Sequence, residues 1–201
     1  FDVYPLYDVT PVSAKGAVLT DINGSEYLDL YGGHAVISIG HSHPHYTQAI
    51  KDQLDKISFY SNAIQNPIQE AYAQKLGALS GCEDYQLFLC NSGAEANENA
   101  LKMASFITGK SKVVAFKNSF HGRTSAAVAV TDNPAIQAPI NKGHEVSFVA
   151  LNDEDRLKEV LSKGDVCALI IESIQGVGGL DQPTTRFFKT IEALCQEQGV
   201  L

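Results

Sequence analysis

The sequence predicts an α/β protein with a mostly parallel β-sheet that helices cover on both faces. From about residue 85 onward, short continuous apolar runs alternate with segments of helical periodicity. Continuous apolar runs are typical of strands buried on both sides, which occur in parallel sheets. With 201 residues, the chain is long enough for one substantial core, or for one domain and part of another.

The region before residue 85 has a different pattern. The runs 17–21 and 26–31 flank an Asn23-Gly24 turn, and this arrangement predicts a β-hairpin. A glycine-rich link follows. Proline at the first helical position then indicates two helices, one beginning at Pro44 and one spanning residues 67–80.

The elements expected after residue 85 alternate between strand and helix. Strands are expected at 86–90, 112–116, 146–151 and 166–172, and helices at 94–107, 153–161 and 185–198. Residues 124–130 are ambiguous between the two types. The last three residues, GVL, are expected to begin a further strand.

Composition and charge argue against several classes of protein. The net charge is −8 and the basic residues are scattered, so a nucleic-acid or anionic-membrane surface is not expected. The longest apolar run is far shorter than a membrane-spanning helix requires. The cysteines lack paired spacing, so free thiols in a reducing, cytoplasmic compartment are expected for Cys82, Cys90, Cys167 and Cys195.

A relaxed P-loop pattern occurs at residues 104–111, ASFITGKS. A P-loop must follow a strand and begin a helix, so that its N–H groups face the phosphates. Here the predicted helix comes first and the strand second. Gly109 is therefore interpreted as a helix C-cap, and nucleotide binding remains a distant alternative.

Three alternating histidines, His41, His43 and His45, raise the possibility of a metal site. Pro44 lies among them at a helix start, and no Cys, Asp or Glu stands within the cluster. A polar turn is favoured, and no metal is expected.

An anion site is suggested by the motif NSGAEA, which follows the predicted strand 86–90. Ser92, Gly93 and Ala94 stand at a helix N-terminus, where unpaired N–H groups and partial positive charge favour a phosphate. A plain N-cap by Ser92 or Asn91 is an equally good interpretation of this motif alone.

Other polar groups follow neighbouring strands. The motif NSFHGRT holds Phe120, His121 and Arg123, and Glu172 ends a later strand, before SIQGVGGL. Ligands gather at the carboxyl ends of parallel strands. One site would then combine phosphate donors, an aromatic ring, an acid and a guanidinium that grips carboxylates. Core packing of Phe120 and a surface ion pair of Arg123 are the alternatives.

Taken together, four motifs resemble class III pyridoxal-phosphate-dependent aminotransferases, within them the acetylornithine and succinylornithine aminotransferase group. The motifs are GHSHP, NSGAEANENALKMA, SFHGRT and IIESIQGVGG, and they occur in the right order over essentially the whole chain. The resemblance implies the type I fold of these enzymes. Residues 1–45 would be an N-terminal segment of the small domain, and 46–201 the first part of the large cofactor-binding domain.

The resemblance also implies roles for individual residues. It assigns binding of pyridoxal 5'-phosphate to Ser92, Gly93, Ala94, Phe120, His121 and Glu172. The first three would hold the phosphate, and the ring of Phe120 would stack on the cofactor. Arg123 would bind a substrate carboxylate. The lysine that binds the cofactor is expected beyond Leu201, so no residue of this chain is assigned as catalytic, and this chain alone is expected to be inactive.

The implied activity is transamination of N-acetyl- or N-succinyl-ornithine with 2-oxoglutarate in arginine biosynthesis, by a homodimer with shared active sites. Aminotransferases acting on another ω-amine, ornithine or 4-aminobutyrate, are the alternative. Val177 stands where the family often has Glu, and Gln65 lies in a stretch where the family favours an aromatic residue. These departures leave the preferred amine open.

Overall fold

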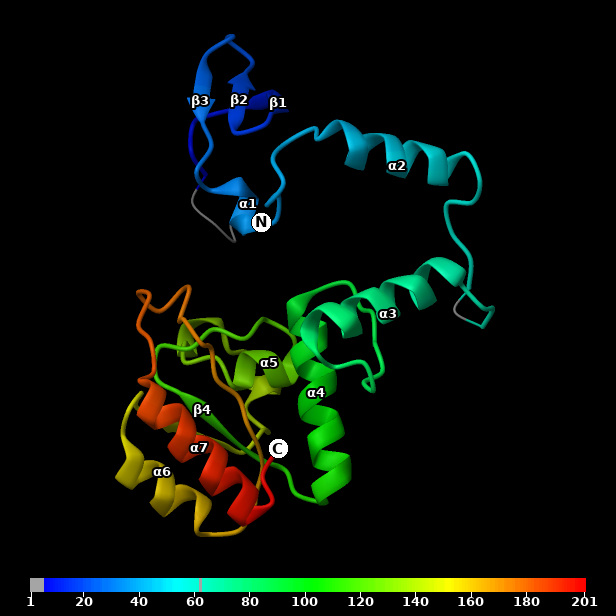
Figure 1. The fold of residues 1–201 in the computed structure, drawn as a ribbon. Coiled ribbons are helices and arrows are strands. Elements are labelled where there is room, and N and C mark those ends of the chain that lie inside the picture. Colours follow the sequence, from blue (N-terminus) through cyan, green and yellow to red (C-terminus); the bar gives the residue numbers. More distant parts are fainter. Residues whose placement is uncertain (1–5, 62) are drawn as a thin grey trace. The chain divides into compact units, whose positions relative to one another are not determined.

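The structure is a computed structural model that describes residues 6–61 and 63–201. The chain divides into two compact units, Phe1–Tyr85 and Gln86–Leu201, and each is described by itself (Figure 1). The boundary expected at residue 45, between a small-domain segment and the large domain, stays a prediction.

The N-terminal unit contains a three-stranded antiparallel sheet. Its strands, in sheet order, are β1 (Pro11–Lys15), β2 (Val18–Asp21) and β3 (Glu26–Leu28). The predicted hairpin is confirmed as the β2–β3 pair. Asp21 closes its turn, because Oδ1 accepts the N–H groups of Asn23 at 2.9 Å and Ser25 at 2.8 Å. β1 was not predicted, since its sequence, PVSAK, has too few apolar residues to show a period.

Local signals define the helices of this unit, α1 (Gly32–Ala35), α2 (Pro44–Leu54) and α3 (Pro67–Ser80). The predictions for α2 and α3 are confirmed. Asn66 caps α3, because its Oδ1 accepts the N–H groups of Ile68 at 3.1 Å and Gln69 at 3.3 Å. Gly81 ends α3 in the left-handed conformation, at φ 73°.

The C-terminal unit is built on a parallel sheet. Its strands, in the order β5-β4-β6, are β5 (Val146–Val149), β4 (Lys112–Phe116) and β6 (Val166–Leu169). Leu201 continues the ladder beside β6: its N–H donates to Cys167 O at 3.1 Å, and its carbonyl accepts from Leu169 N at 2.8 Å. The chain end therefore lies where a further strand was expected to begin.

Helices cover both faces of this sheet. They are α4 (Gly93–Thr108), α5 (Ser125–Ala129), α6 (Glu154–Leu161) and α7 (Thr185–Gln198), and the 3₁₀ turns are η1 (Pro134–Ile136) and η2 (Pro139–Asn141). The ambiguous stretch 124–130 is therefore largely helical.

Alternate residues of β4 point into two separate cores. Phe116 packs against Phe187 of α7 with ring centroids 5.8 Å apart, in the cluster that includes α6. Ala115 belongs to the opposite cluster, with Leu101 of α4. The prediction of a parallel sheet covered on both faces is confirmed, and α6 and α7 lie side by side on one of them (Figure 1).

The predicted strand at 86–90 is wrong. In the structure these residues form no strand, and Leu87, Phe88 and Leu89 are exposed. A strand exists only with a ladder partner, and no described residue pairs with this segment. The predicted strands at 146–151 and 166–172 are present but shorter.

The P-loop alternative fails on the order of elements. Gly109, at φ 68°, ends α4 and donates its N–H to Ser105 O at 2.9 Å. The TGKS stretch therefore lies between the end of a helix and the start of β4, so its N–H groups do not open a helix. The C-cap prediction is confirmed.

The four cysteines are free, as expected from their spacing. Burial raises the pKa of the Cys167 and Cys195 thiols, so both stay protonated at neutral pH. No helix among residues 6–61 and 63–201 has the length and apolar character needed to cross a bilayer.

Candidate functional site

The loop after β4, residues 117–124, holds together the candidate site of the C-terminal unit. On one side it touches the start of α4, and on the other the segment 172–178, which follows β6. Two of these three segments follow the carboxyl ends of parallel strands, where ligands bind in open α/β sheets.

The start of α4 has the geometry of an anion site. Ser92 is its N-cap: Oγ accepts the Glu95 N–H at 3.1 Å and donates to Glu95 Oε2 at 2.8 Å. The N–H groups of Gly93 and Ala94 precede the first intrahelical bond and point out of the helix end. A Cβ added to Gly93 would meet nothing within 4 Å, so there is room for a ligand against the backbone.

A close backbone contact joins this helix start to the β4 loop. Gly122 has φ 135°, and a Cβ there would stand 2.6 Å from the Cβ of Ala94. Only glycine fits, because both the conformation and the contact reject a side chain. Asn97 adds a hydrogen bond of 2.8 Å from Nδ2 to the carbonyl of His121. The NSGAEA motif and the NSFHGRT motif are therefore neighbours in space.

The other side of the loop is bonded to the segment after β6. Glu172 Oε2 accepts the N–H of Phe120 at 3.0 Å, across 52 positions of sequence. Partial burial raises the pKa of Glu172, although hydrogen bonds from the N–H groups of Phe120 and Gly176 oppose this effect. The structure thus brings Ala94, Phe120 and Glu172 to one place.

His121 is buried inside this arrangement. Its side chain is 6% exposed, and among the described residues Nε2 has no hydrogen-bond partner. Burial lowers the pKa of His121 from 6.5 to about 4, so the imidazole is neutral at physiological pH. The backbone N–H of His121 donates to Thr131 Oγ1 at 2.9 Å.

Arg123 and Phe120 are both accessible members of the loop. Arg123 is exposed and Phe120 is partly exposed. A guanidinium and an aromatic ring that both reach the surface beside a helix N-terminus can bind a planar anionic ligand. Phe120 is therefore not fully enclosed in a core, and its stacking role stays a prediction.

Glu98 is a structural residue that the sequence did not suggest. Its carboxylate accepts the N–H groups of Ala126 and Ala127 at 2.9 and 3.0 Å and the Thr124 hydroxyl at 2.7 Å. Burial alone would raise the pKa of Glu98, but these donors outweigh it and hold the pKa below 4.5. Glu98 thereby fixes the first turn of α5 and the end of the loop that carries Arg123. No sequence spacing indicates a bond over this distance.

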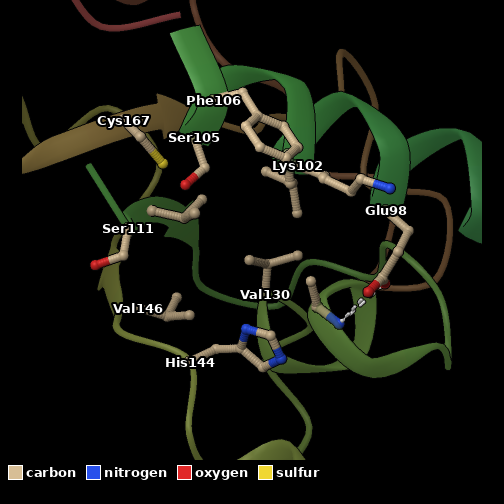
Figure 2. A pocket seen from close by; sticks show the side chains of 12 residues that line it. Glu98, Lys102, Ser105, Phe106, Ser111, Val130, His144, Val146 and Cys167 are labelled. Atoms are coloured by element: carbon tan, nitrogen blue, oxygen red, sulfur yellow. Dashed lines mark hydrogen bonds between the residues drawn. The ribbon is translucent and has the colours of Figure 1, made fainter. Parts of the chain in front are cut away.

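Figure 2 shows a cavity of about 410 Å³ elsewhere in the same unit. Glu98 and Phe106 of α4 line one side, and His144 and Val146 the other. Val146 is the first residue of β5, so this cavity opens toward the amino ends of the strands. None of the predicted site residues lines it, and it lies at the edge opposite to that where ligands gather.

One histidine of the 41–45 cluster contacts a carboxylate from the preceding segment. His41 Nε2 is 2.6 Å from Asp29 Oδ2. Among the described residues, no group of three His, Cys, Asp or Glu side chains is arranged to hold a metal ion.

Comparison with known proteins assigns the family. The family model Aminotransferase class-III matches residues 3–201. Acetylornithine aminotransferases from Bacillus amyloliquefaciens and Bacillus subtilis are each 40% identical over 204 residues. They align with all of this chain, which covers 87% and 52% of those sequences respectively.

A solved structure supports the same conclusion. Ornithine aminotransferase from Toxoplasma gondii, whose active site holds partly occupied PLP, has a TM-score of 0.89 and 29% identity. It matches all of this chain but only 49% of its own length is covered, so this chain spans about half of that enzyme and of the Bacillus subtilis relative. The expected type I fold of pyridoxal-phosphate enzymes is confirmed. The chain belongs to the class III aminotransferase family.

Proposed function

We propose that this chain is the N-terminal part of a pyridoxal-phosphate-dependent aminotransferase that transfers the δ-amino group of N-acetyl- or N-succinyl-ornithine to 2-oxoglutarate, in arginine biosynthesis. The observation that carries the proposal is the junction of the α4 start, the Phe120 loop and Glu172. The relatives named acetylornithine aminotransferase support the choice of amine.

The residues at this junction fit the cofactor. Gly93 and Ala94 present N–H groups at a positive helix end with open space beside it, and Ser92 adds a hydroxyl, which suits a phosphate. Phe120 offers a partly exposed ring face for the pyridine, and His121 and Glu172 lie beside it in the same loop junction. Because Gly93 has no side chain, the phosphate can approach the backbone N–H groups closely.

Pyridoxal phosphate, when bound, supplies an electron sink for the carbanion that forms on the amino donor. The residues of this chain bind and orient. Arg123 holds a substrate carboxylate in bidentate fashion, which places the reacting carbon near the cofactor.

The lysine required for catalysis is proposed to lie outside this chain. Lys117 is engaged elsewhere, with Nζ 3.6 Å from Asp132 Oδ1 and 5.4 Å from the ring centroid of Phe148. Lys102 lies on the exposed side of α4, at the cavity of Figure 2. We therefore propose that the chain alone is inactive, and that the complete enzyme is a cytoplasmic homodimer with shared active sites.

Arg123→Ala in the full-length enzyme tests the site. Loss of a charge-assisted pair worth about 1.5–3 kcal/mol should raise the KM for both amino donor and 2-oxoglutarate by roughly ten- to a hundredfold. Arg186→Ala is the matched control, because Arg186 is an exposed arginine paired with Glu154 on α6. Equal kinetics for Arg123→Ala and Arg186→Ala would refute the assigned role.

A panel of amino donors tests the substrate. With 2-oxoglutarate as acceptor, N-acetylornithine or N-succinylornithine should turn over faster than ornithine or 4-aminobutyrate. Val177, 72% exposed in the segment after β6, is the position to exchange if the order is reversed. Fast turnover of 4-aminobutyrate with none of either acylornithine would overturn the proposal in favour of another ω-amino acid aminotransferase.

A further inference from the structure

The backbone of residues 117–121 is fixed from two directions, and the first is the segment after α5. Asn118 N–H donates to Asp132 Oδ2 at 2.9 Å, and Ser119 Oγ donates to Val130 O at 3.1 Å. His121 N–H donates to Thr131 Oγ1 at 2.9 Å. The residues on both sides of Phe120 are thus anchored to one short segment, 130–132.

Phe120 itself is anchored in the opposite direction. Its N–H donates to Glu172 Oε2, and the next groups after β6 reinforce this side. Gln175, 1% exposed, donates from Nε2 to Lys117 O at 2.7 Å. Gly178 lies so close that an added Cβ would be 2.2 Å from Asn118 O.

The two sets of bonds act on different parts of the same loop. The bonds to 130–132 fix the peptides before and after Phe120. The bond to Glu172 holds the backbone N–H of Phe120 itself. Because this nitrogen is bonded to the Cα that carries the ring, the contact fixes the backbone orientation from which the ring projects.

We propose that Glu172 is a positioning residue, which accepts the Phe120 N–H and thereby holds the backbone from which the Phe120 ring reaches toward the cofactor. The inference rests on the proposed function, in which that ring stacks on pyridoxal phosphate. In this inference Glu172 acts through its hydrogen bond to Phe120, and not through an electrostatic contact between its carboxylate and the cofactor. Gln175 and Gly178 hold the segment that carries Glu172 in register with the loop.

Two substitutions in the full-length enzyme separate these roles. Glu172→Gln keeps an oxygen at the same reach but loses the charge. Glu172→Asp keeps the charge but withdraws the oxygen by one methylene. If Glu172 acts through the Phe120 N–H, Glu172→Asp should be impaired more than Glu172→Gln, because only Gln keeps an acceptor oxygen at the required distance from the chain.

The readouts are kinetic and spectroscopic. Glu172→Asp should lower kcat by roughly ten- to a hundredfold, as expected for a misplacement of about 1 Å. Its KM for 2-oxoglutarate should stay within about twofold, because Arg123 is untouched. The visible circular dichroism of bound pyridoxal phosphate should change more in Glu172→Asp than in Glu172→Gln. Glu159→Gln, an exposed carboxylate paired with Arg156 on α6, is the control for loss of one negative charge.

The outcomes distinguish this inference from the proposed function. Impairment of Glu172→Gln with normal Glu172→Asp would overturn the inference, since charge and not reach would matter. Unchanged kinetics and circular dichroism in both variants would overturn it as well. If the unmodified full-length enzyme develops no visible band with pyridoxal phosphate, the proposed function itself fails, and the inference fails with it.

Discussion

The two compact units differ in how their elements are stabilised. Among the described residues, every buried apolar side chain lies in the C-terminal unit. Phe187 of α7 is 0% exposed, whereas Ile68 and Tyr72 of α3 are 58% and 49% exposed. In the N-terminal unit, the buried side chain is that of Asp21, which closes a turn.

This difference separates two sources of structure in one chain. Prolines, a capping asparagine and left-handed glycines define the N-terminal helices through signals within a few residues. The C-terminal elements are held by contacts between residues far apart in sequence, such as Phe116 with Phe187. Substitutions should therefore have large effects where packing dominates and small ones where local signals do.

The largest effect is expected in the core of the C-terminal unit. Phe187→Ala removes a fully buried ring that packs edge-to-face on Phe116, and should lower the free energy of unfolding by about 3–5 kcal/mol. Urea denaturation measures the loss. Ile68→Ala on α3 is the contrast, with an expected loss of less than about 1 kcal/mol. Similar losses for the two variants would remove the distinction between the units.

A second large effect concerns pH and His121. Burial lowers the pKa of His121 from 6.5 to about 4. Below pH 6.5 the unfolded chain takes up a proton that the folded chain rejects, so stability present above pH 6.5 is lost as the pH falls toward 4. The loss is on the order of 3 kcal/mol.

Urea denaturation at a series of pH values tests this dependence. His121→Asn cannot titrate, so its unfolding free energy should fall less between pH 7 and pH 4, by roughly 3 kcal/mol. Identical slopes for the variant and the unmodified protein would show that His121 does not titrate abnormally.

The smallest effect is expected for a local signal. Asn66→Ala removes the oxygen that caps α3, at a cost of about 1 kcal/mol. Asn66→Asp keeps an oxygen acceptor and is the matched control. Amide hydrogen exchange of Ile68 and Gln69 measures the change directly. An effect larger than that of Phe187→Ala would mean that capping, and not burial, dominates stability.

Sequence patterns were informative wherever the cause of structure is local. Pro44, Pro67, Gly81 and Gly109 mark helix ends through backbone geometry alone, and all four predictions are confirmed. Periodicity also identified β4 and the helices that cover it, because a core needs apolar residues at fixed intervals.

Long-range pairing was not accessible in the same way. The run 86–90 has the composition of a strand but no ladder partner among the described residues. The bonds of Glu98 to α5 and of Gln175 to Lys117 span 28 and 58 positions, and no spacing rule predicts them. Motifs at strand ends did indicate that Phe120 and Glu172 would be neighbours, since the parallel strands β4 and β6 end at the same edge of the sheet. Ala94 lies there too, although the strand expected before it is absent.

The contact between Gly122 and Ala94 couples two segments of the chain. Because no methyl group fits at position 122, any larger residue there would displace the start of α4 relative to the loop 117–124. Any shift of one backbone is transmitted to the other. Under the proposed function, we expect exposed side chains such as Val177, and not this contact, to tune the amine preference.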